Sequence, residues 1–193
     1  LQSLAETGLN YCKDIYDKER YQRIRDISAE IVSHMTDIPN IKVKDLFCNE
    51  SGYQTPKLDT RAAIFEDGKI LLVHENDGKW SLPGGWVDVN VSVGENVVKE
   101  VKEESGLDVI TEKVIAIQDR SKHNLPIYAY GICKIFVQCS VIGGKFEENN
   151  ETTEYRYFSI SELPELATEK NTVEQIKMCF EAYESDNWKT LLD

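Results

Sequence analysis

The sequence from Leu82 to Leu107 reads LPGGWVDVNVSVGENVVKEVKEESGL, and it predicts a loop, then a helix, then a helix end. Pro83-Gly84-Gly85 is a typical loop sequence. Ser92 with Glu95 three residues later forms a capping box, in which each side chain bonds the backbone N–H of the other residue. The glycine that follows the second serine suits the left-handed conformation found after many helices. We therefore expect a helix over Val93–Ser105.

Three glutamates of this predicted helix, Glu100, Glu103 and Glu104, fall within an arc of about 100°. Val97 and Val101 occupy the neighbouring arc, which we expect to face the core. Like charges one turn apart repel each other, and a divalent cation would remove that repulsion. Carboxylate oxygens are the ligands that Mg²⁺ and Mn²⁺ prefer. The glutamate face is a candidate Mg²⁺ site, with Mn²⁺ as a substitute; the alternative is a solvated acidic surface.

The same segment resembles a known family motif. Read from Gly85, its spacing is G-x5-V-x7-K-E-V-x-E-E-S-G-L, which closely resembles the Nudix box, G-x5-E-x7-R-E-U-x-E-E-x-G-U with U apolar. Val91 replaces the first glutamate, and Lys99 replaces the arginine, keeping the charge but losing the bidentate fork. The resemblance implies the fold class α+β, as an α/β/α sandwich with a mixed sheet, and it implies that the three glutamates bind the metal.

The chain before the box differs from the chain around it. Apolar residues recur every three or four positions between Asp17 and Met35, which predicts an amphipathic helix. Turn residues over 48–57 predict a linker, so we place a helical domain at 1–57 and the Nudix domain at 58–193. β-branched and aromatic runs predict strands over 61–65, 70–74, 109–117, 127–140 and 155–158, and a capping box predicts a helix over 172–183. The N-terminal part resembles the small domain of a bacterial Nudix subgroup that acts on nucleoside diphosphates linked to another moiety, such as ADP-ribose or CDP-choline.

The resemblance implies hydrolysis of a diphosphate bond, with water converting NDP-X to NMP and X-phosphate. Metal ions on the glutamate face would neutralise the diphosphate and activate the water. For the general base, Glu103 is the candidate within the box, and Glu151 or Glu154 is the candidate on a later segment, where we favour Glu154. A solvated strand-edge carboxylate is the alternative for Glu154.

Several other side chains are candidates for substrate contacts. Arg61, Lys122 and His123 are cations set among apolar strands or in a loop, and we expect them to face substrate phosphate; exposed charge is the alternative. Trp80 and Trp86 flank the Pro-Gly-Gly loop, where a tryptophan either stacks on a nucleobase or packs at the core.

Composition limits the partners. The 193 residues include 22 Lys+Arg and 34 Asp+Glu, a net charge of −12, which argues against bulk nucleic-acid binding. No apolar run is long enough for a membrane span, and five scattered cysteines predict reduced thiols in the cytoplasm. We expect a homodimer with a small nucleotide substrate. The alternatives are a catalytically weak nucleotide-binding Nudix regulator, or a pyrophosphohydrolase of nucleoside triphosphates or RNA ends.

Overall fold

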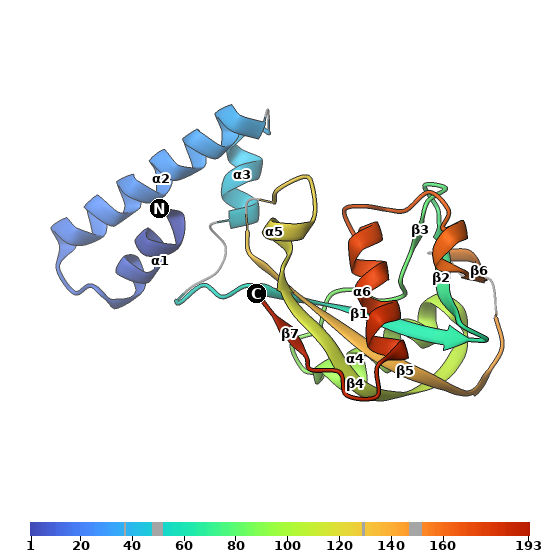
Figure 1. Ribbon diagram of the computed structural model, residues 1–193. Coiled ribbons are helices and arrows are strands. Elements are labelled where there is room, and N and C mark those ends of the chain that lie inside the picture. Colours follow the sequence, from blue (N-terminus) through green and yellow to red (C-terminus); the bar gives the residue numbers. More distant parts are fainter. Residues whose placement is uncertain (37, 48–51, 129, 147–151) are drawn as a thin grey trace. The chain divides into compact units, whose positions relative to one another are not determined.

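The computed structural model describes residues 1–36, 38–47, 52–128, 130–146 and 152–193. They form two compact units, Leu1–Pro56 and Lys57–Asp193, which are drawn together in Figure 1. The predicted boundary after residue 57 lies one residue beyond this division. Each unit is described by itself.

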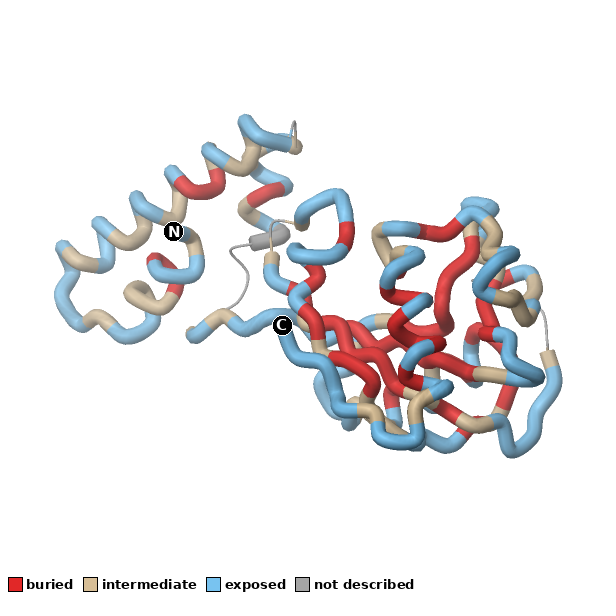
Figure 2. The backbone as a smooth tube through the Cα atoms, in the orientation of Figure 1, coloured by how far each residue is buried: buried red, intermediate tan, exposed pale blue. Residues whose placement is uncertain are grey.

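Within its described residues, the first unit contains three helices, α1 (Gln2–Tyr11), α2 (Ile15–Thr36) and α3 (Asn40–Phe47). The helix predicted between Asp17 and Met35 is the central part of α2. Ion pairs join the helices, because Arg25 of α2 lies 3.3 Å from Glu6 of α1, and Lys44 of α3 lies 2.9 Å from Asp26 of α2. Buried positions are few along these helices, as Figure 2 shows.

The second unit is built on a mixed sheet in the order β3-β2-β1-β5-β4-β7, with β6 paired to β2. β1 runs parallel to β5 and β4 runs parallel to β7, whereas the other named pairs are antiparallel. The strands are β1 (Lys57–Glu66), β2 (Lys69–Glu75), β3 (Trp80–Ser81), β4 (Leu107–Asp119), β5 (Ile132–Gly144), β6 (Thr152–Phe158) and β7 (Leu191–Leu192).

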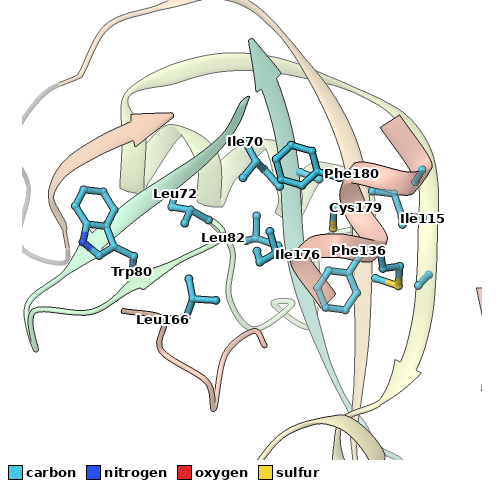
Figure 3. Packing of buried hydrophobic residues seen from close by; sticks show 14 residues of the cluster. Ile70, Leu72, Trp80, Leu82, Ile115, Phe136, Leu166, Ile176, Cys179 and Phe180 are labelled. Atoms are coloured by element: carbon cyan, nitrogen blue, oxygen red, sulfur yellow. The ribbon is translucent and has the colours of Figure 1, made fainter. Parts of the chain in front are cut away.

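Helices cover both faces of this sheet. The amphipathic helix α6 (Val173–Glu184) buries Ile176 and Phe180 in one cluster, together with Leu72 and Leu82 (Figure 3). The helix α4 (Val93–Ser105) buries Val97 and Val101 in the other cluster, which contains apolar residues of β1, β2, β4 and β5. The expected α/β/α sandwich with a mixed sheet is therefore confirmed.

The structure differs from the sequence prediction in the bounds of one long strand and in the short elements. The strand expected over 127–140 begins at Ile132 and extends to Gly144. The helices α3 and α5 (Arg120–His123), the turn η1 (Ile160–Glu162) and the two-residue strands β3 and β7 carry too few residues to show a hydrophobic period. No helix in the described part of the chain is both long enough and apolar enough to cross a membrane.

Candidate active site

The loop before α4 lies against β1 and is held there by backbone hydrogen bonds. The amide of Thr60 donates to the carbonyl of Gly85 (2.9 Å), and the amide of Ala62 donates to the carbonyl of Pro83 (2.8 Å). Gly84 has φ +141°, and a Cβ there would lie 2.0 Å from the carbonyl oxygen of Thr60. The close approach of loop and strand therefore requires glycine at position 84.

The helix itself begins and ends as its sequence predicts. Ser92 and Glu95 form both bonds of the capping box, and Gly106 adopts the left-handed conformation after Ser105. The orientation of α4 is fixed further by Asn96, whose side-chain amide donates to the hydroxyl of Thr60 (3.0 Å). These contacts set the position of the glutamate face relative to the loop.

Two of the three glutamates point at the loop. The backbone amide of Gly84 donates to Oε2 of Glu104 (2.8 Å), and a Cβ at Gly85 would lie 2.6 Å from Oε2 of Glu100. Glu104 is buried, and this burial raises its pKa to about 8, although the charge of Arg61 and the Gly84 amide act in the opposite direction. Gly85 thus leaves room for the carboxylate of Glu100, and the amide of Gly84 binds that of Glu104.

The third glutamate, Glu103, has a side chain 55% exposed and lies beside Lys99. The Lys99 ammonium lies 2.9 Å from Asp88, 3.6 Å from Glu100 and 3.7 Å from Glu103. Its pKa is above the usual value, mainly because of the hydrogen bond to Asp88. Lysine at this position therefore still reaches two of the box glutamates as a point charge.

A buried ion-pair network on β1 and β5 holds the start of the loop. Asp59 binds Arg61 and Lys134, each at 2.8 Å, and all three side chains are at most 6% exposed. Arg61 also donates to the carbonyl of Leu82 (3.3 Å), and Asn171 accepts from the amide of the same residue (2.8 Å). Both backbone groups at the start of the loop are therefore held by buried side chains.

An open cavity of about 350 Å³ lies beside Glu104. Glu75 and Asp77 line it from the β2–β3 connection, and Glu169 and Lys170 line it from the segment before α6. The Lys170 ammonium pairs with Glu75. Solvent in the cavity can therefore reach the buried carboxylate of Glu104, and Lys170 is a cation that lines the cavity.

Two family models match the chain. One, described as a UDP-X-like, N-terminal oligomerisation domain, matches residues 1–47, and the other, described as a NUDIX domain, matches residues 56–178. The chain belongs to the Nudix family. The expected pairing of a helical N-terminal domain with a Nudix domain is confirmed.

Relatives of known name are similar to this Nudix chain over most of its length. A protein of Bacillus subtilis (strain 168) named "Putative ADP-ribose pyrophosphatase YjhB" is 40% identical, over 100% of this chain and 93% of that protein. A crystal structure described as an ADP-ribose pyrophosphatase from Streptococcus suis 89-1591 is 55% identical, with a TM-score of 0.68, over 72% of this chain and 100% of that one. A crystal structure described as UDP-X diphosphatase is 33% identical, with a TM-score of 0.68, over 98% of this chain and 93% of that one. The prediction of a Nudix enzyme is confirmed.

The donor set of the Nudix box suits a divalent cation. Glu104 is a buried carboxylate whose ionised form a nearby cation would favour, and Glu100 occupies a cradle that any side chain at residue 85 would fill. Among the residues that the structure describes, no three Asp, Glu, His or Cys side chains already stand close enough together to hold an ion. The fit rests on the oxygen donors of the three glutamates, of which Glu103 is turned toward Lys99.

The predicted base on a later segment, Glu154, is paired with an arginine of its own strand. Glu154 of β6 pairs with Arg156 (2.8 Å), whose guanidinium lies 5.7 Å from the ring centre of Trp80. Trp80 belongs to the cluster that α6 covers, and residues 154 and 156 share a face because strand side chains alternate. Glu154 therefore faces the side of the sheet away from α4. Glu151 lies outside the described residues.

The three predicted phosphate contacts occupy two different places. Arg61 is buried in the Asp59 network beneath the loop. Lys122 and His123 lie in α5, at the end of β4, where His123 pairs with Asp193. The structure does not bring these three cations together, and their contacts with substrate stay predictions.

The sequence does not predict five polar residues that support the loop and the helix, namely Asp59, Asp88, Asn96, Lys134 and Asn171. Their contacts join segments that are far apart in the chain, and polar residues of this kind show no fixed spacing. Asp59 and Lys134 did carry one usable signal, because a charged residue within an apolar strand is buried only when it is paired.

Proposed function

We propose that this Nudix enzyme hydrolyses the diphosphate bond of a nucleoside diphosphate linked to another moiety, with ADP-ribose as the first candidate substrate and Mg²⁺ as the cofactor. The observation that carries the proposal is the contact of Glu100 and Glu104 with the Gly84-Gly85 loop, beside an open cavity. The printed names of the relatives support the substrate class. UDP-linked and CDP-choline-like substrates are the other candidates within it.

In the proposed reaction, water attacks one phosphorus, the bridging P–O bond breaks, and NMP and X-phosphate leave. A divalent ion held by the three box glutamates would neutralise the diphosphate and activate the water. The amide of Gly84 orients the Glu104 carboxylate, and Lys99 orients Glu100. We propose Glu103 as the acceptor of the water proton because its side chain is 55% exposed and lies on the same helix as Glu100 and Glu104.

One assay tests this proposal. The protein is incubated with ADP-ribose, UDP-glucose, CDP-choline, NADH and deoxynucleoside triphosphates, each with Mg²⁺, and the nucleotide products are separated by chromatography. We expect AMP from ADP-ribose, loss of turnover in EDTA, and recovery with Mg²⁺ or Mn²⁺. Metal-independent cleavage would contradict the role of the glutamates. Binding of a nucleotide with no cleavage of any would favour a regulator, and cleavage of triphosphates alone would favour a pyrophosphohydrolase of that class.

We also propose that the protein is a homodimer associated through its first unit. Apolar side chains along α2 are between 37% and 79% exposed, namely Ile24, Ile27, Ile31 and Met35. A continuous apolar stripe of this kind is typical of a surface that another chain covers. The description of the family model that matches residues 1–47 supports this proposal.

The cysteines support a cytoplasmic location. Cys12, Cys133, Cys139 and Cys179 are free thiols, as expected in a reducing compartment. We retain the cytoplasm as the proposed location of this enzyme.

A further inference from the structure

We propose that Lys170 binds a phosphate group of the substrate in the cavity beside Glu104; this inference rests on the proposed function. Lys170 belongs to residues 167–171, which lie between η1 and α6 and which we call the cavity segment. Among the described residues that line the cavity, Lys170 is the one cation, and the others with charge are the carboxylates Glu75, Asp77, Glu104 and Glu169. An anionic substrate that reaches Glu104 through this cavity therefore meets the Lys170 ammonium.

Hydrogen bonds from buried side chains fix the backbone of the cavity segment. Three consecutive carbonyls each accept from a buried side chain that is distant in the sequence, namely that of Thr168 from Asn124 (2.8 Å), that of Glu169 from Arg120 (3.2 Å) and that of Lys170 from Lys134. Carbonyls of a connecting segment at the surface can bond to water instead, so three buried donors indicate that the position of this segment is specified. The backbone of Lys170 is therefore held in place before any ligand binds.

The cavity segment is also tied to the loop that binds Glu104. Its last residue, Asn171, accepts a hydrogen bond from the amide of Leu82 (2.8 Å). Leu82 lies two residues before Gly84, whose amide donates to Glu104 (2.8 Å). Two buried hydrogen bonds and short stretches of chain thus connect Lys170 to the carboxylate of Glu104. The structure sets these two side chains relative to each other.

The side chain of Lys170 is accessible although its backbone is fixed. Its ammonium pairs with Glu75 (2.5 Å), and the Lys170 side chain is 33% exposed. An ammonium has three N–H donors, so one carboxylate partner leaves donors for a phosphate oxygen. The cations of the buried network, Arg61 and Lys134, are at most 6% exposed and are paired with Asp59, so their charges are used within the protein. Lys170 is therefore the cation that a ligand in the cavity can contact.

The charges around the cavity make phosphate binding depend on two cations. The described lining holds more carboxylates than ammonium groups, so a phosphate alone is repelled. A divalent cation at the box glutamates would offset this repulsion, and Lys170 would then bind an oxygen of the diphosphate. Hydrolysis places additional negative charge on the departing phosphate, which the ammonium also stabilises. We expect binding of a diphosphate to require both Mg²⁺ and Lys170.

Glu75 competes with the substrate for the Lys170 ammonium. Glu75 also accepts from the hydroxyl of Ser81 (2.5 Å), so its carboxylate is fixed at the end of β2. If the pair only ties β2 to the cavity segment, loss of either partner has the same effect. If Lys170 binds the substrate, removing the charge of Glu75 strengthens binding, and removing the charge of Lys170 weakens it. The two changes therefore separate a structural tie from substrate binding.

The test compares Lys170→Met, which keeps the length but loses the charge, with Lys170→Arg, which keeps the charge. Hydrogen bonds to charged groups correspond to about a 10- to 100-fold change in affinity, so we expect Lys170→Met to lower kcat/KM for ADP-ribose by that factor. Lys170→Arg should restore most of it, and Glu75→Gln should raise kcat/KM above that of the wild type. Lys177→Met is the matched control, because Lys177 is an exposed lysine of α6. Melting temperatures check that all variants fold, and equal losses in Lys170→Met and Glu75→Gln would overturn the proposal.

A second measurement needs no turnover. Methylenediphosphonate, a diphosphate analogue that is not hydrolysed, is titrated into the protein in a calorimeter. With Mg²⁺ we expect its affinity to be at least about 10-fold lower for Lys170→Met than for the wild type and Lys177→Met, and in EDTA we expect no binding. If the wild type cleaves ADP-ribose and Lys170→Met matches it in rate and in binding, the Lys170 assignment is wrong and the proposed function stands. If no nucleoside diphosphate is cleaved but the analogue binds through Lys170, the proposed function is wrong and the phosphate site stands.

Discussion

The loop and helix from Leu82 to Ser105 differ from the N-terminal helices in how far contacts within one chain hold their polar groups and bury their apolar side chains. In the first region, backbone amides, glycines and a buried ion-pair network hold the carboxylates in place. In the second region, the helix α2 leaves Ile27, Ile31 and Met35 open to solvent. The difference indicates that the candidate site is assembled within one unit, whereas the first unit presents an exposed apolar stripe, through which we propose that two chains associate.

The largest effect should come from the glutamate face. Glu104→Gln removes the charge but keeps the size and the bond to the Gly84 amide, so we expect turnover to fall by about 10²- to 10⁴-fold, as several kcal/mol of metal-assisted stabilisation would imply. Steady-state hydrolysis of ADP-ribose measures it, with the melting temperature as a folding check. The control is Glu181→Gln, an exposed carboxylate on α6. A rate near that of the wild type in Glu104→Gln would contradict the metal-site assignment.

The next effect concerns the buried network beneath the loop. Asp59→Asn leaves Arg61 and Lys134 buried with no carboxylate between them, and we expect the free energy of unfolding to fall by about 3–5 kcal/mol. Asp17→Asn breaks an exposed pair with Arg20 in the first unit, and it should cost less than about 1 kcal/mol. Urea denaturation measures both. Equal losses would contradict the contrast between the two regions.

The same network predicts a pH dependence. Burial raises the pKa of Asp59, but the neighbouring Arg61 and Lys134 outweigh it, so the pKa lies below its ordinary value of 3.8. A lowered folded-state pKa means that the stabilisation is complete above 3.8 and is lost as the pH falls through the folded-state pKa. The stability gap between the wild type and Asp59→Asn should therefore narrow in acid, measured by urea denaturation at pH 7 and below pH 3.8. A stability difference that stays the same at both pH values would contradict the stabilising role of the ionised Asp59 carboxylate.

A smaller effect tests the close packing of the loop on β1. Gly84→Ala places a Cβ against the carbonyl of Thr60 at a positive φ, and we expect a loss of at least about 1–3 kcal/mol of stability. Gly94→Ala is the matched control because it lies in α4 with open space around it, so its stability should be unchanged or higher by up to about 1 kcal/mol. Thermal unfolding compares them. A Gly84→Ala protein as stable as Gly94→Ala would contradict the close packing of the loop on β1.

The smallest effect on activity should come from the first unit. Ile27→Asp places a charge in the apolar stripe of α2, and we expect the dimer to dissociate while turnover per chain changes little, because the glutamate face lies in the second unit. Size-exclusion chromatography with light scattering measures the mass. Lys18→Asp, at an exposed polar position of the same helix, is the control. A dimer that survives Ile27→Asp would exclude this stripe as the interface.

Long periodic elements and their caps were predictable because their signals are local. The helix α4 begins at Val93 and ends at Ser105 as its capping box and terminal glycine predict. The strand expected from residue 127 begins only at Ile132, because the aromatic residues Tyr128 and Tyr130 suggested a strand but lie in the chain before it, where their rings contact each other. Strands of two residues, such as β3, form only because a neighbouring strand supplies their hydrogen bonds.

The sequence by itself determined the family, the helix that carries Glu100, Glu103 and Glu104, and the approximate positions of the main strands along the chain. These properties depend on spacing along the chain, and spacing is visible without a fold. Only the tertiary structure decided that Arg61 is buried beneath the loop, that Glu154 faces away from α4, and that Trp86 meets Tyr130. Such contacts depend on which strands pair and on the face to which each side chain points, and both are set by the packing of residues distant in sequence.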